Sequence, residues 1–472
     1  MRFISRFLTL SALFSSVTSS ASTSHDLSSL LHKGASPATV AAAAKVGPLP
    51  GITHDSFAGT FSVNSSANAN HFFWFWPALN GNKSAPLLVW MQGGPGSSSL
   101  FGLFCEHGPY RLNASLYPIP APYSWANEYN SVYLDNPRGT GYSYADILCT
   151  DWTCYGSDFD VWMRQFQTVF GSMYTSVVIT GESYGGHYVP ASAYTVFMNN
   201  AVGILPSVPL AGIAIGNGFS APLEMVQGYA DIIYNAGLLS PSEYLTAQSY
   251  QANITTQILA EDYVGAYLTW DAFLNGDSTL GGAWFTNVTG LTNYFNVAIE
   301  TPPDFSYYSA YVTSNAVRNA LGVGTRKYND GNLAVELALT GDVMFTQKPR
   351  IEALLTAGLR VLIYNGALDL ICGAPLTERY VPLLQWPGAA AFNATPKALW
   401  HDPIYPGGAI SGYARETNNF VNVVMRGAGH VSSFMLMKDL FMRSKFLPPY
   451  PPPPPPPLPL HRWHLLINHR AL

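Results

Sequence analysis

Six short runs of apolar, β-forming residues recur along this chain, and longer segments separate them. A strand that is buried on both faces of a parallel sheet reads as such a run. Helical patterns lie between several of the runs, for example over 159–170 and 187–199. This alternation predicts an α/β fold with a mostly parallel central sheet covered by helices on both faces. The six runs are Leu87–Met91, Ser131–Leu134, Val177–Thr180, Ile213–Ile215, Arg360–Tyr364 and Phe420–Met425.

The alternation is interrupted between the fourth and fifth runs. Residues 219–349 are rich in Tyr, Asn and Thr, and a connection of this length is typical of an insertion. We therefore expect an inserted cap over 219–349, with the core formed by 22–218 and 350–447. The remaining segment, 448–472, begins almost entirely with proline and favours extended polyproline II. We expect this proline-rich tail to lie outside the fold.

The N-terminus has the pattern of a cleavable signal peptide over 1–21. Arg2 and Arg6 precede an apolar run that ends in small residues. The run is too short to span a membrane, and no later segment has the roughly 20 apolar residues that a span requires. The alternative is a buried N-terminal helix. The signal peptide predicts entry into the secretory pathway, for secretion or for a lysosome or vacuole. Six glycosylation sequons fit this route: Asn64, Asn82, Asn113, Asn253, Asn287 and Asn393.

The composition permits a large hydrophobic core and argues against nucleic acid as a partner. Hydrophobic residues make up 48% of the chain and charged residues 11%, against about a quarter in ordinary soluble proteins. The net charge is -5, and no stripe of Lys and Arg is present to neutralise a phosphate backbone. We therefore expect no nucleic-acid partner.

Four cysteines suit an oxidising compartment. Cys149 and Cys154 are close enough in sequence to form a disulfide. The sequence does not decide whether Cys105 and Cys372 pair with each other or remain free thiols. The chain has no C-x-x-C pair and no H-E-x-x-H helix, so we predict no metal site and no cofactor.

Gly181-Glu182-Ser183-Tyr184-Gly185 follows the third β run and precedes a helical pattern. This is the strand, turn and helix context of a G-x-S-x-G nucleophile elbow. The glycines matter because the sharp turn leaves no room for side chains beside an exposed Ser183 hydroxyl. The alternative is a chance turn of glycine and serine.

A serine hydroxyl becomes nucleophilic only when a base takes its proton, and a carboxylate must orient that base. In the α/β-hydrolase fold these partners follow the serine in the order acid, then histidine. Asp369 follows the fifth β run, and His430 follows the sixth within Gly427-Ala428-Gly429-His430. If the chain has this fold, Asp369 and His430 are therefore the candidates for the acid and the base. Each residue could instead belong to an ordinary loop.

Acyl transfer also needs hydrogen-bond donors for the developing oxyanion. The loop Gly93-Gly94-Pro95-Gly96 directly follows the first β run and offers main-chain N–H groups. We expect the second donor to be the N–H of Tyr184, the residue after the nucleophile.

Together these segments resemble the serine carboxypeptidases, most closely the vitellogenic-like branch. The resemblance covers about residues 57–447, and the loop at 93–96 combined with this elbow is highly specific to the family. The matching motifs are Trp90-Met91-Gln92-Gly93-Gly94-Pro95-Gly96-Ser97-Ser98, Glu106-His107-Gly108-Pro109, Asp135-Asn136-Pro137, Gly139-Thr140-Gly141, Gly181-Glu182-Ser183-Tyr184, Tyr188-Val189-Pro190, Ile215-Gly216-Asn217-Gly218, Tyr364-Asn365-Gly366-Ala367-Leu368-Asp369 and Gly427-Ala428-Gly429-His430.

The resemblance implies a role for each matching position. Ser183, Asp369 and His430 would form a catalytic triad, with the oxyanion hole made by the N–H groups of Gly94 and Tyr184. Four further residues would bind the terminal carboxylate of the substrate: Trp90, Gln92, Glu106 and Glu182. Two glutamates that share a proton can face a carboxylate only while one is protonated, so the resemblance predicts activity at acidic pH.

The chain departs from the family pattern at several positions. Gln92 replaces the usual Asn and keeps the amide donor, and Arg138 replaces a usually small apolar residue, which leaves the geometry of the nearby pocket open. After His430 the chain continues with Val431-Ser432-Ser433-Phe434 in place of a proline-containing pattern. Cys372 matches a cysteine that part of the family keeps as a free thiol near the active site.

We therefore expect a serine carboxypeptidase that acts on peptides or proteins with a free C-terminus. Two alternatives remain. One is an acyltransferase that resembles the serine carboxypeptidases, and the other is a protective glycoprotein that binds a partner and has weak activity. The sequence leaves open the preferred terminal residues, cleavage into two chains and the formation of a homodimer.

Overall fold

The structure is a computed structural model that describes residues 25–277, 282–401 and 408–432. The predicted signal peptide (1–21) and proline-rich tail (448–472) lie outside the described residues, as does 433–447 of the predicted second core segment. Among the described residues, no helix has the length and apolar character needed to cross a membrane.

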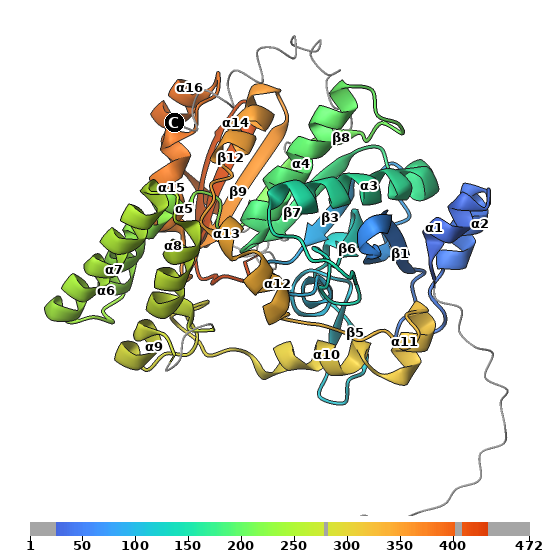
Figure 1. Ribbon diagram of the computed structural model, residues 1–472, viewed down its shortest axis with the longest axis horizontal. Helices are drawn as coiled ribbons and strands as arrows, with labels where there is room; N and C mark the ends of the chain where they lie inside the picture. The colour runs from blue at the N-terminus through green and yellow to red at the C-terminus, as the bar shows by residue number, and fades with distance from the viewer. Residues whose placement is uncertain (1–24, 278–281, 402–407, 433–472) are drawn as a thin grey trace, which may run out of the picture.

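A twisted sheet of ten strands runs through the centre of the molecule, in the order β1-β2-β6-β3-β7-β8-β9-β12-β11-β10 (Figure 1). A separate two-stranded sheet is formed by β4 and β5. The strands are β1 (Phe57–Asn64), β2 (Ala69–Trp76), β3 (Leu87–Met91), β4 (Tyr110–Leu112), β5 (Pro118–Pro120), β6 (Asn130–Leu134), β7 (Val177–Glu182), β8 (Leu210–Gly216), β9 (Arg360–Gly366), β10 (Ala398–His401), β11 (Ile410–Thr417) and β12 (Phe420–Met425).

The six central strands, from β6 to β12 in sheet order, are all parallel to one another, and they correspond to the six predicted runs. The predicted α/β class with a mostly parallel sheet is confirmed. Sequence reasoning missed the antiparallel strands at the two edges, β1 and β2 on one side and β10 and β11 on the other. Polar residues interrupt these strands: Asn70 and His71 break the apolar run in β2, and buried and exposed positions mix along β11.

The sheet buries side chains on both faces. Successive residues of a strand point to opposite faces. In β3, Leu87 and Val89 therefore join one apolar cluster with helices α3 and α4, while Leu88 and Trp90 join a second cluster on the other face. This two-sided burial explains why the central strands are mainly apolar.

Helices cover the sheet and form a large segment beside it. Helix α3 packs on α4, and α4 packs on β7, β8 and α14. The helices are α1 (Leu27–His32), α2 (Pro37–Ala44), α3 (Trp152–Phe170), α4 (Gly185–Ala201), α5 (Pro222–Met225), α6 (Tyr229–Asn235), α7 (Pro241–Leu259), α8 (Tyr263–Trp270), α9 (Trp284–Thr289), α10 (Tyr307–Val312), α11 (Asn315–Leu321), α12 (Leu333–Ala338), α13 (Thr340–Val343), α14 (Lys348–Thr356), α15 (Ala374–Tyr380) and α16 (Ala389–Ala394).

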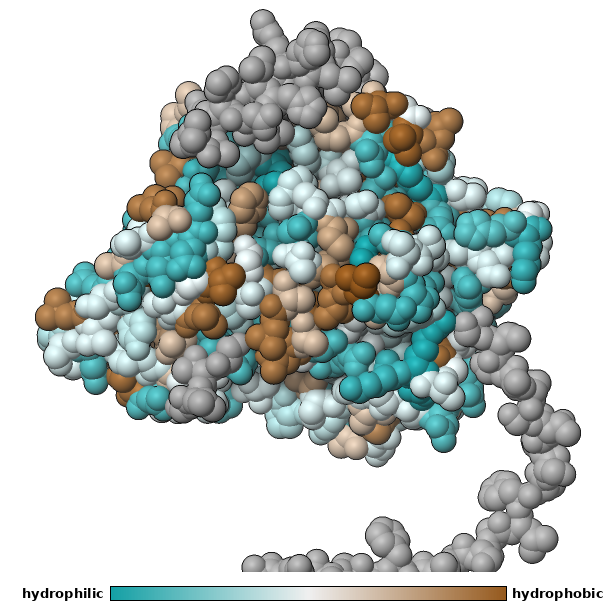
Figure 2. Space-filling view, viewed as in Figure 1, coloured by the Kyte–Doolittle hydropathy of each residue, from teal (hydrophilic) through white to brown (hydrophobic). Residues whose placement is uncertain are grey.

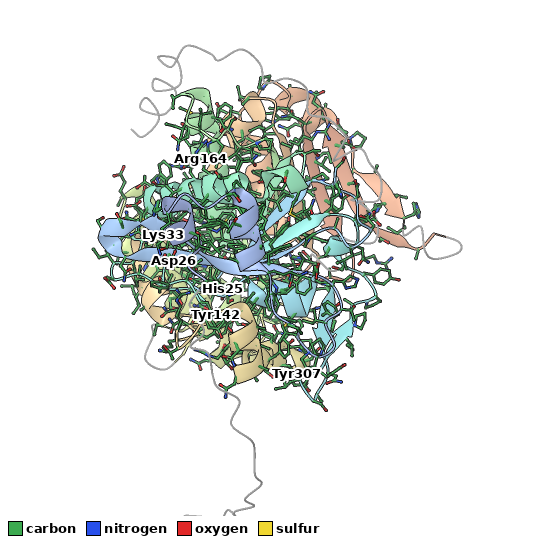
Figure 3. All side chains as sticks on the ribbon, turned by 90° about the vertical axis from the view of Figure 1, so that its right-hand side faces the viewer. His25, Asp26, Lys33, Tyr142, Arg164 and Tyr307 are labelled. Carbon is green, nitrogen blue, oxygen red and sulfur yellow. A yellow bond between two sulfur atoms is a disulfide. The ribbon has the colours of Figure 1, made fainter. Side chains whose placement is uncertain are left out.

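The described part of the chain between β8 and β9 contains helices α5 to α14 and contributes no strand to the sheet. Helices α6 to α9 gather at one side of the molecule, and α10 and α11 run along its lower border (Figure 1). We call the residues from 219 to 349 the helical insertion. His25 and Asp26, at the start of the described residues, lie beside the sheet (Figure 3), and the main chain of Asp26 forms a β-bridge with Thr60 of β1.

Candidate active site

The predicted site residues follow the carboxyl ends of neighbouring parallel strands. In sheet order these strands are β3, β7, β8, β9 and β12. The 93–96 loop follows β3, Ser183 follows β7, Asp369 follows β9 and His430 follows β12. In open α/β sheets, ligands bind at the edge that is formed by the carboxyl ends of the parallel strands. The predicted site residues therefore lie where a binding site is expected.

Ser183 sits in a strained turn between β7 and α4. Its φ is +62°, a left-handed conformation that is uncommon for residues other than glycine. Main-chain hydrogen bonds hold the turn, because Ser183 N donates to Gly216 O at 3.1 Å and Ser183 O accepts from Phe219 N at 2.9 Å. A Cβ on Gly181 would lie 2.6 Å from Met91 O of the neighbouring strand. This is the nucleophile-elbow geometry, in which strain and close packing present the serine at the end of the sheet.

The loop after β3 packs directly on this elbow. A Cβ on Gly93 would lie 2.6 Å from both Ser183 Cβ and Tyr184 N, so glycine is required here. The next residue, Gly94, has a φ of +113°. Among the described residues, neither Gly94 N–H nor Tyr184 N–H donates a hydrogen bond, and both residues line the same cavity as Ser183. Two available donors beside a serine can stabilise an oxyanion.

Asp369 and His430 are in direct contact. His430 Nδ1 lies 2.8 Å from Asp369 Oδ2, and the carboxylate is fully buried. Main-chain N–H groups of Ile371 (2.9 Å) and Cys372 (3.2 Å) also donate to this carboxylate. A carboxylate held in this way fixes the imidazole ring and its tautomer, so that Nε2 is the nitrogen left to act as a base.

Ser183 and His430 line one cavity of about 910 Å³. Among the described residues no hydrogen bond joins the Ser183 hydroxyl to the His430 imidazole. The structure therefore brings the acid and the base together and places the serine in the same cavity. The proton transfer between Ser183 and His430 stays a prediction.

Asn217, which follows β8, was quoted as part of a motif but given no function from the sequence. Its Nδ2 donates to Asp369 Oδ2 at 2.7 Å, and its Oδ1 accepts from Gly366 N at 3.1 Å. The position of Asn217 at the carboxyl end of the strand between β7 and β9 was the available signal.

The four residues expected to bind a terminal carboxylate lie in two layers. Gln92 and Glu182 line the cavity, whereas Trp90 and Glu106 are buried behind it. Trp90 Nε1 donates to Gln92 Oε1 at 2.9 Å, and Gln92 Nε2 donates to Glu182 Oε1 at 3.3 Å. Trp90 thus fixes the Gln92 amide with its NH₂ group toward Glu182.

Burial raises the pKa of Glu182 well above its ordinary value, and the nearby carboxylates of Glu106 and Asp369 raise it further. Loss of hydration disfavours the charged form of an acid, and a second negative charge has the same effect. Glu182 is therefore expected to be protonated at acidic pH, when it can donate a hydrogen bond to an anionic ligand.

The rest of the cavity wall comes mainly from the helical insertion and is acidic. Within the described residues it includes one arginine, Arg111, which donates to the main-chain oxygens of Phe104 and Glu106. The carboxylates that line this wall are Asp277, Glu300, Asp304, Asp330 and Glu336. Figure 2 shows hydrophobic side chains on the surface in the region of α8 and α12. Leu268 of α8 and Leu333 of α12 are exposed.

Arg138, the residue that left the geometry of the nearby pocket open, does not line the cavity. The Arg138 guanidinium is buried and binds the Asp158 carboxylate through two hydrogen bonds of 2.5 and 2.7 Å. Charge pairing with a residue on α3 thus explains a charged side chain at a buried position.

The cysteines fall into two classes. Cys149 and Cys154 form a disulfide with Cα atoms 5.5 Å apart, whereas Cys105 and Cys372 are buried free thiols that line the cavity. The one group of potential metal ligands in the described residues consists of this disulfide and Asp158. Oxidised sulfurs and a carboxylate paired with Arg138 do not suit a metal ion.

Residues 49–442 match the model of a protein family described as serine carboxypeptidase. The probable serine carboxypeptidase CPVL of Rattus norvegicus is 37% identical over 82% of this chain and 81% of its own length. The vitellogenic carboxypeptidase of Aedes aegypti is 31% identical over 80% of each chain. Kex1Δp, a prohormone-processing carboxypeptidase of Saccharomyces cerevisiae, has a similar structure, with a TM-score of 0.75 and 20% identity over 86% of this chain and 96% of its own.

The chain belongs to the serine carboxypeptidase family. It is accordingly a serine-type carboxypeptidase, a hydrolase of peptide bonds, as the sequence predicted. The structural similarity confirms the predicted α/β-hydrolase fold.

Proposed function

We propose that this chain removes the last residue of peptides and proteins with a free C-terminus, and that Ser183, Asp369 and His430 form its catalytic triad. The observation that carries this assignment is the 2.8 Å contact between His430 and buried Asp369, in a cavity that also exposes the Ser183 elbow. Family membership supports the activity, and the local geometry supports the residues.

The reaction runs through an acyl-enzyme. Ser183 Oγ attacks the carbonyl carbon of the last peptide bond while His430 Nε2 takes the hydroxyl proton. The N–H groups of Gly94 and Tyr184 stabilise the oxyanion of the tetrahedral intermediate. His430 then gives its proton to the departing amine as the carbon–nitrogen bond breaks. Water, activated by His430, attacks the acyl-enzyme and restores Ser183.

Recognition of the free C-terminus depends on Gln92 and Glu182 at the cavity surface, supported by Trp90 and Glu106. The Gln92 amide and the protonated Glu182 carboxyl both offer donors to an incoming carboxylate. Because the raised pKa keeps Glu182 protonated in acid, we expect binding to be tighter at acidic than at neutral pH.

The secretory pathway is the proposed location. The Cys149–Cys154 disulfide is typical of oxidising compartments. Five of the six sequon asparagines are exposed, and Asn64 is half-buried. Treatment with an endoglycosidase, followed by mass spectrometry, would identify the occupied sites. The exposed asparagines are Asn82, Asn113, Asn253, Asn287 and Asn393.

The test compares the wild-type chain with Ser183→Ala on N-blocked dipeptides between about pH 4 and 8. We expect free amino acid to be released by the wild type, faster in acid, and not by the variant. Acyl transfer from a glucose ester would instead favour the acyltransferase. A cellular effect that survives Ser183→Ala, without any peptidase activity in the wild type, would favour the partner-binding glycoprotein.

A further inference from the structure

Ser432 lies two residues after His430 and is completely buried. Its Oγ donates a hydrogen bond to Asn217 Oδ1 at 2.6 Å, and its main-chain N–H donates to His430 O at 2.8 Å. The same main-chain N–H also interacts with the Glu182 carboxyl, a contact that substitutions of the Ser432 side chain leave in place. Ser432 therefore places a hydroxyl group on the side of the active site that faces the protein interior.

Asn217 connects this hydroxyl to the acid of the triad. An amide has a donor end and an acceptor end that are nearly the same shape, so its orientation depends on its partners. Gly366 N–H and the Ser432 hydroxyl both donate to Asn217 Oδ1. These two donors direct Asn217 Nδ2 toward Asp369 Oδ2, the atom that also contacts His430.

The contacts form a closed chain. It runs from Ser432 through Asn217 and Asp369 to His430, which is joined to Ser432 by the main chain. Every residue in it is at most 5% exposed. Buried hydrogen bonds in such networks are stronger than exposed ones and depend on one another.

Ser432 does not line the cavity, although its neighbour Val431 does. Its hydroxyl is thus placed to act on the triad without touching substrate. Loss of the hydroxyl would leave Gly366 N–H as the single donor to Asn217 Oδ1 among the described residues.

We propose that Ser432 is a positioning residue: its hydroxyl orients the Asn217 amide, which holds the Asp369 carboxylate where it fixes His430. This inference rests on the proposed triad. It predicts that the hydroxyl changes kcat and leaves KM unchanged.

The test compares Ser432→Thr with Ser432→Val in the full-length chain. The two new side chains have nearly the same shape, so they share any packing cost and differ in the hydroxyl. We expect the kcat of Ser432→Val to be about 3- to 10-fold below that of Ser432→Thr, the effect of losing one buried hydrogen bond. KM is expected to agree within about 2-fold. Equal kcat values, or a difference confined to KM, would overturn the proposal.

A double-mutant cycle gives a second measurement if the branched side chains prevent folding. Ser432→Ala is expected to lower kcat in the wild-type background and to have no effect when Asn217 is already Ala, because both changes break the same chain. Additive effects would show that Ser432 acts by another route.

These outcomes are distinguishable from a failure of the proposed function. If the wild type releases amino acid in a Ser183-dependent way but the Ser432 variants follow neither pattern, this inference alone is wrong. If wild type and Ser183→Ala have the same activity, the assignment of the triad is wrong.

Discussion

The two sides of the cavity are built in different ways. The strand ends place Ser183, Asn217, Asp369 and His430 by main-chain hydrogen bonds and buried side-chain contacts. The helical insertion provides a wall with exposed or half-buried carboxylates, such as Asp277 and Glu336. Rigid strand ends suit bond-breaking chemistry, which needs atoms held in place. The wall offers variable contacts that suit selection among substrates.

The largest expected effect on the strand-end side comes from Asp369→Asn. The new side chain has almost the same shape but donates hydrogen bonds through an NH₂ group, so it favours the wrong His430 tautomer. We expect kcat/KM for a blocked dipeptide to fall about 10⁴-fold, with melting temperature as the control for folding. A variant that kept more than about a tenth of the activity would remove Asp369 from the triad.

A smaller loss is expected from Gly93→Ala. The added Cβ would lie 2.6 Å from Ser183 Cβ and from Tyr184 N, so the 93–96 loop must move away from the elbow. The displaced Gly94 N–H would stabilise the oxyanion poorly, and kcat would fall about 10²-fold. Gly341→Ala is the matched control because a Cβ there meets no atom within 4 Å. Equal kcat values in the two variants would contradict the assigned oxyanion hole.

The pH dependence of KM should distinguish Glu182→Gln from the wild type. As pH rises through the raised pKa, wild-type Glu182 ionises, repels the substrate carboxylate and increases KM. Glutamine stays neutral, so we expect the variant to lose most of this increase, a difference of about 10-fold at the alkaline end. KM would be measured from about pH 4 to 8. Identical profiles would show that Glu182 is not the titrating group.

The smallest effect is expected on the wall of the insertion. Glu336 accepts a hydrogen bond from Tyr267 at 2.7 Å, and burial raises its pKa. At neutral pH its charge should favour substrates with Lys over Leu upstream of the cleaved bond. We expect Glu336→Gln to reduce this preference about 3-fold and leave the Leu substrate unchanged.

The control for that experiment is Glu128→Gln, at an exposed position outside the cavity lining. Because protonation removes the charge of Glu336, the Lys preference of the wild type should also weaken as the pH falls. A uniform loss on both substrates would mean that Glu336 supports the wall without selecting charge.

The strand-end side was the more predictable of the two from the sequence. Its six strands read as apolar runs because each is buried on both faces, and the elbow glycines follow from the close approach of Gly181 to β3. The order of the residues along the chain then indicated Asp369 as the acid and His430 as the base. The side-chain hydrogen bonds of Asn217 were harder to predict because they join residues between 149 and 215 positions apart.

The wall could not be predicted in the same way. Its lining carboxylates lie on short helices and loops without a repeated pattern, so their convergence depends on tertiary packing. The buried ion pair of Arg138 could not be predicted for a related reason. Its partner Asp158 lies on α3, and a local comparison of motifs has no information about that contact.

The most direct test of the central claim is a comparison of two substrates that differ only at the C-terminus, an N-blocked dipeptide acid and its amide. Product release would be followed by mass spectrometry at acidic pH for the wild type and Ser183→Ala. The account predicts that the wild type cleaves the acid at least about 10-fold faster than the amide, since only the acid has a carboxylate for Gln92 and Glu182 to bind. It also predicts that Ser183→Ala cleaves neither. Equal cleavage of acid and amide, or activity in Ser183→Ala, would contradict it.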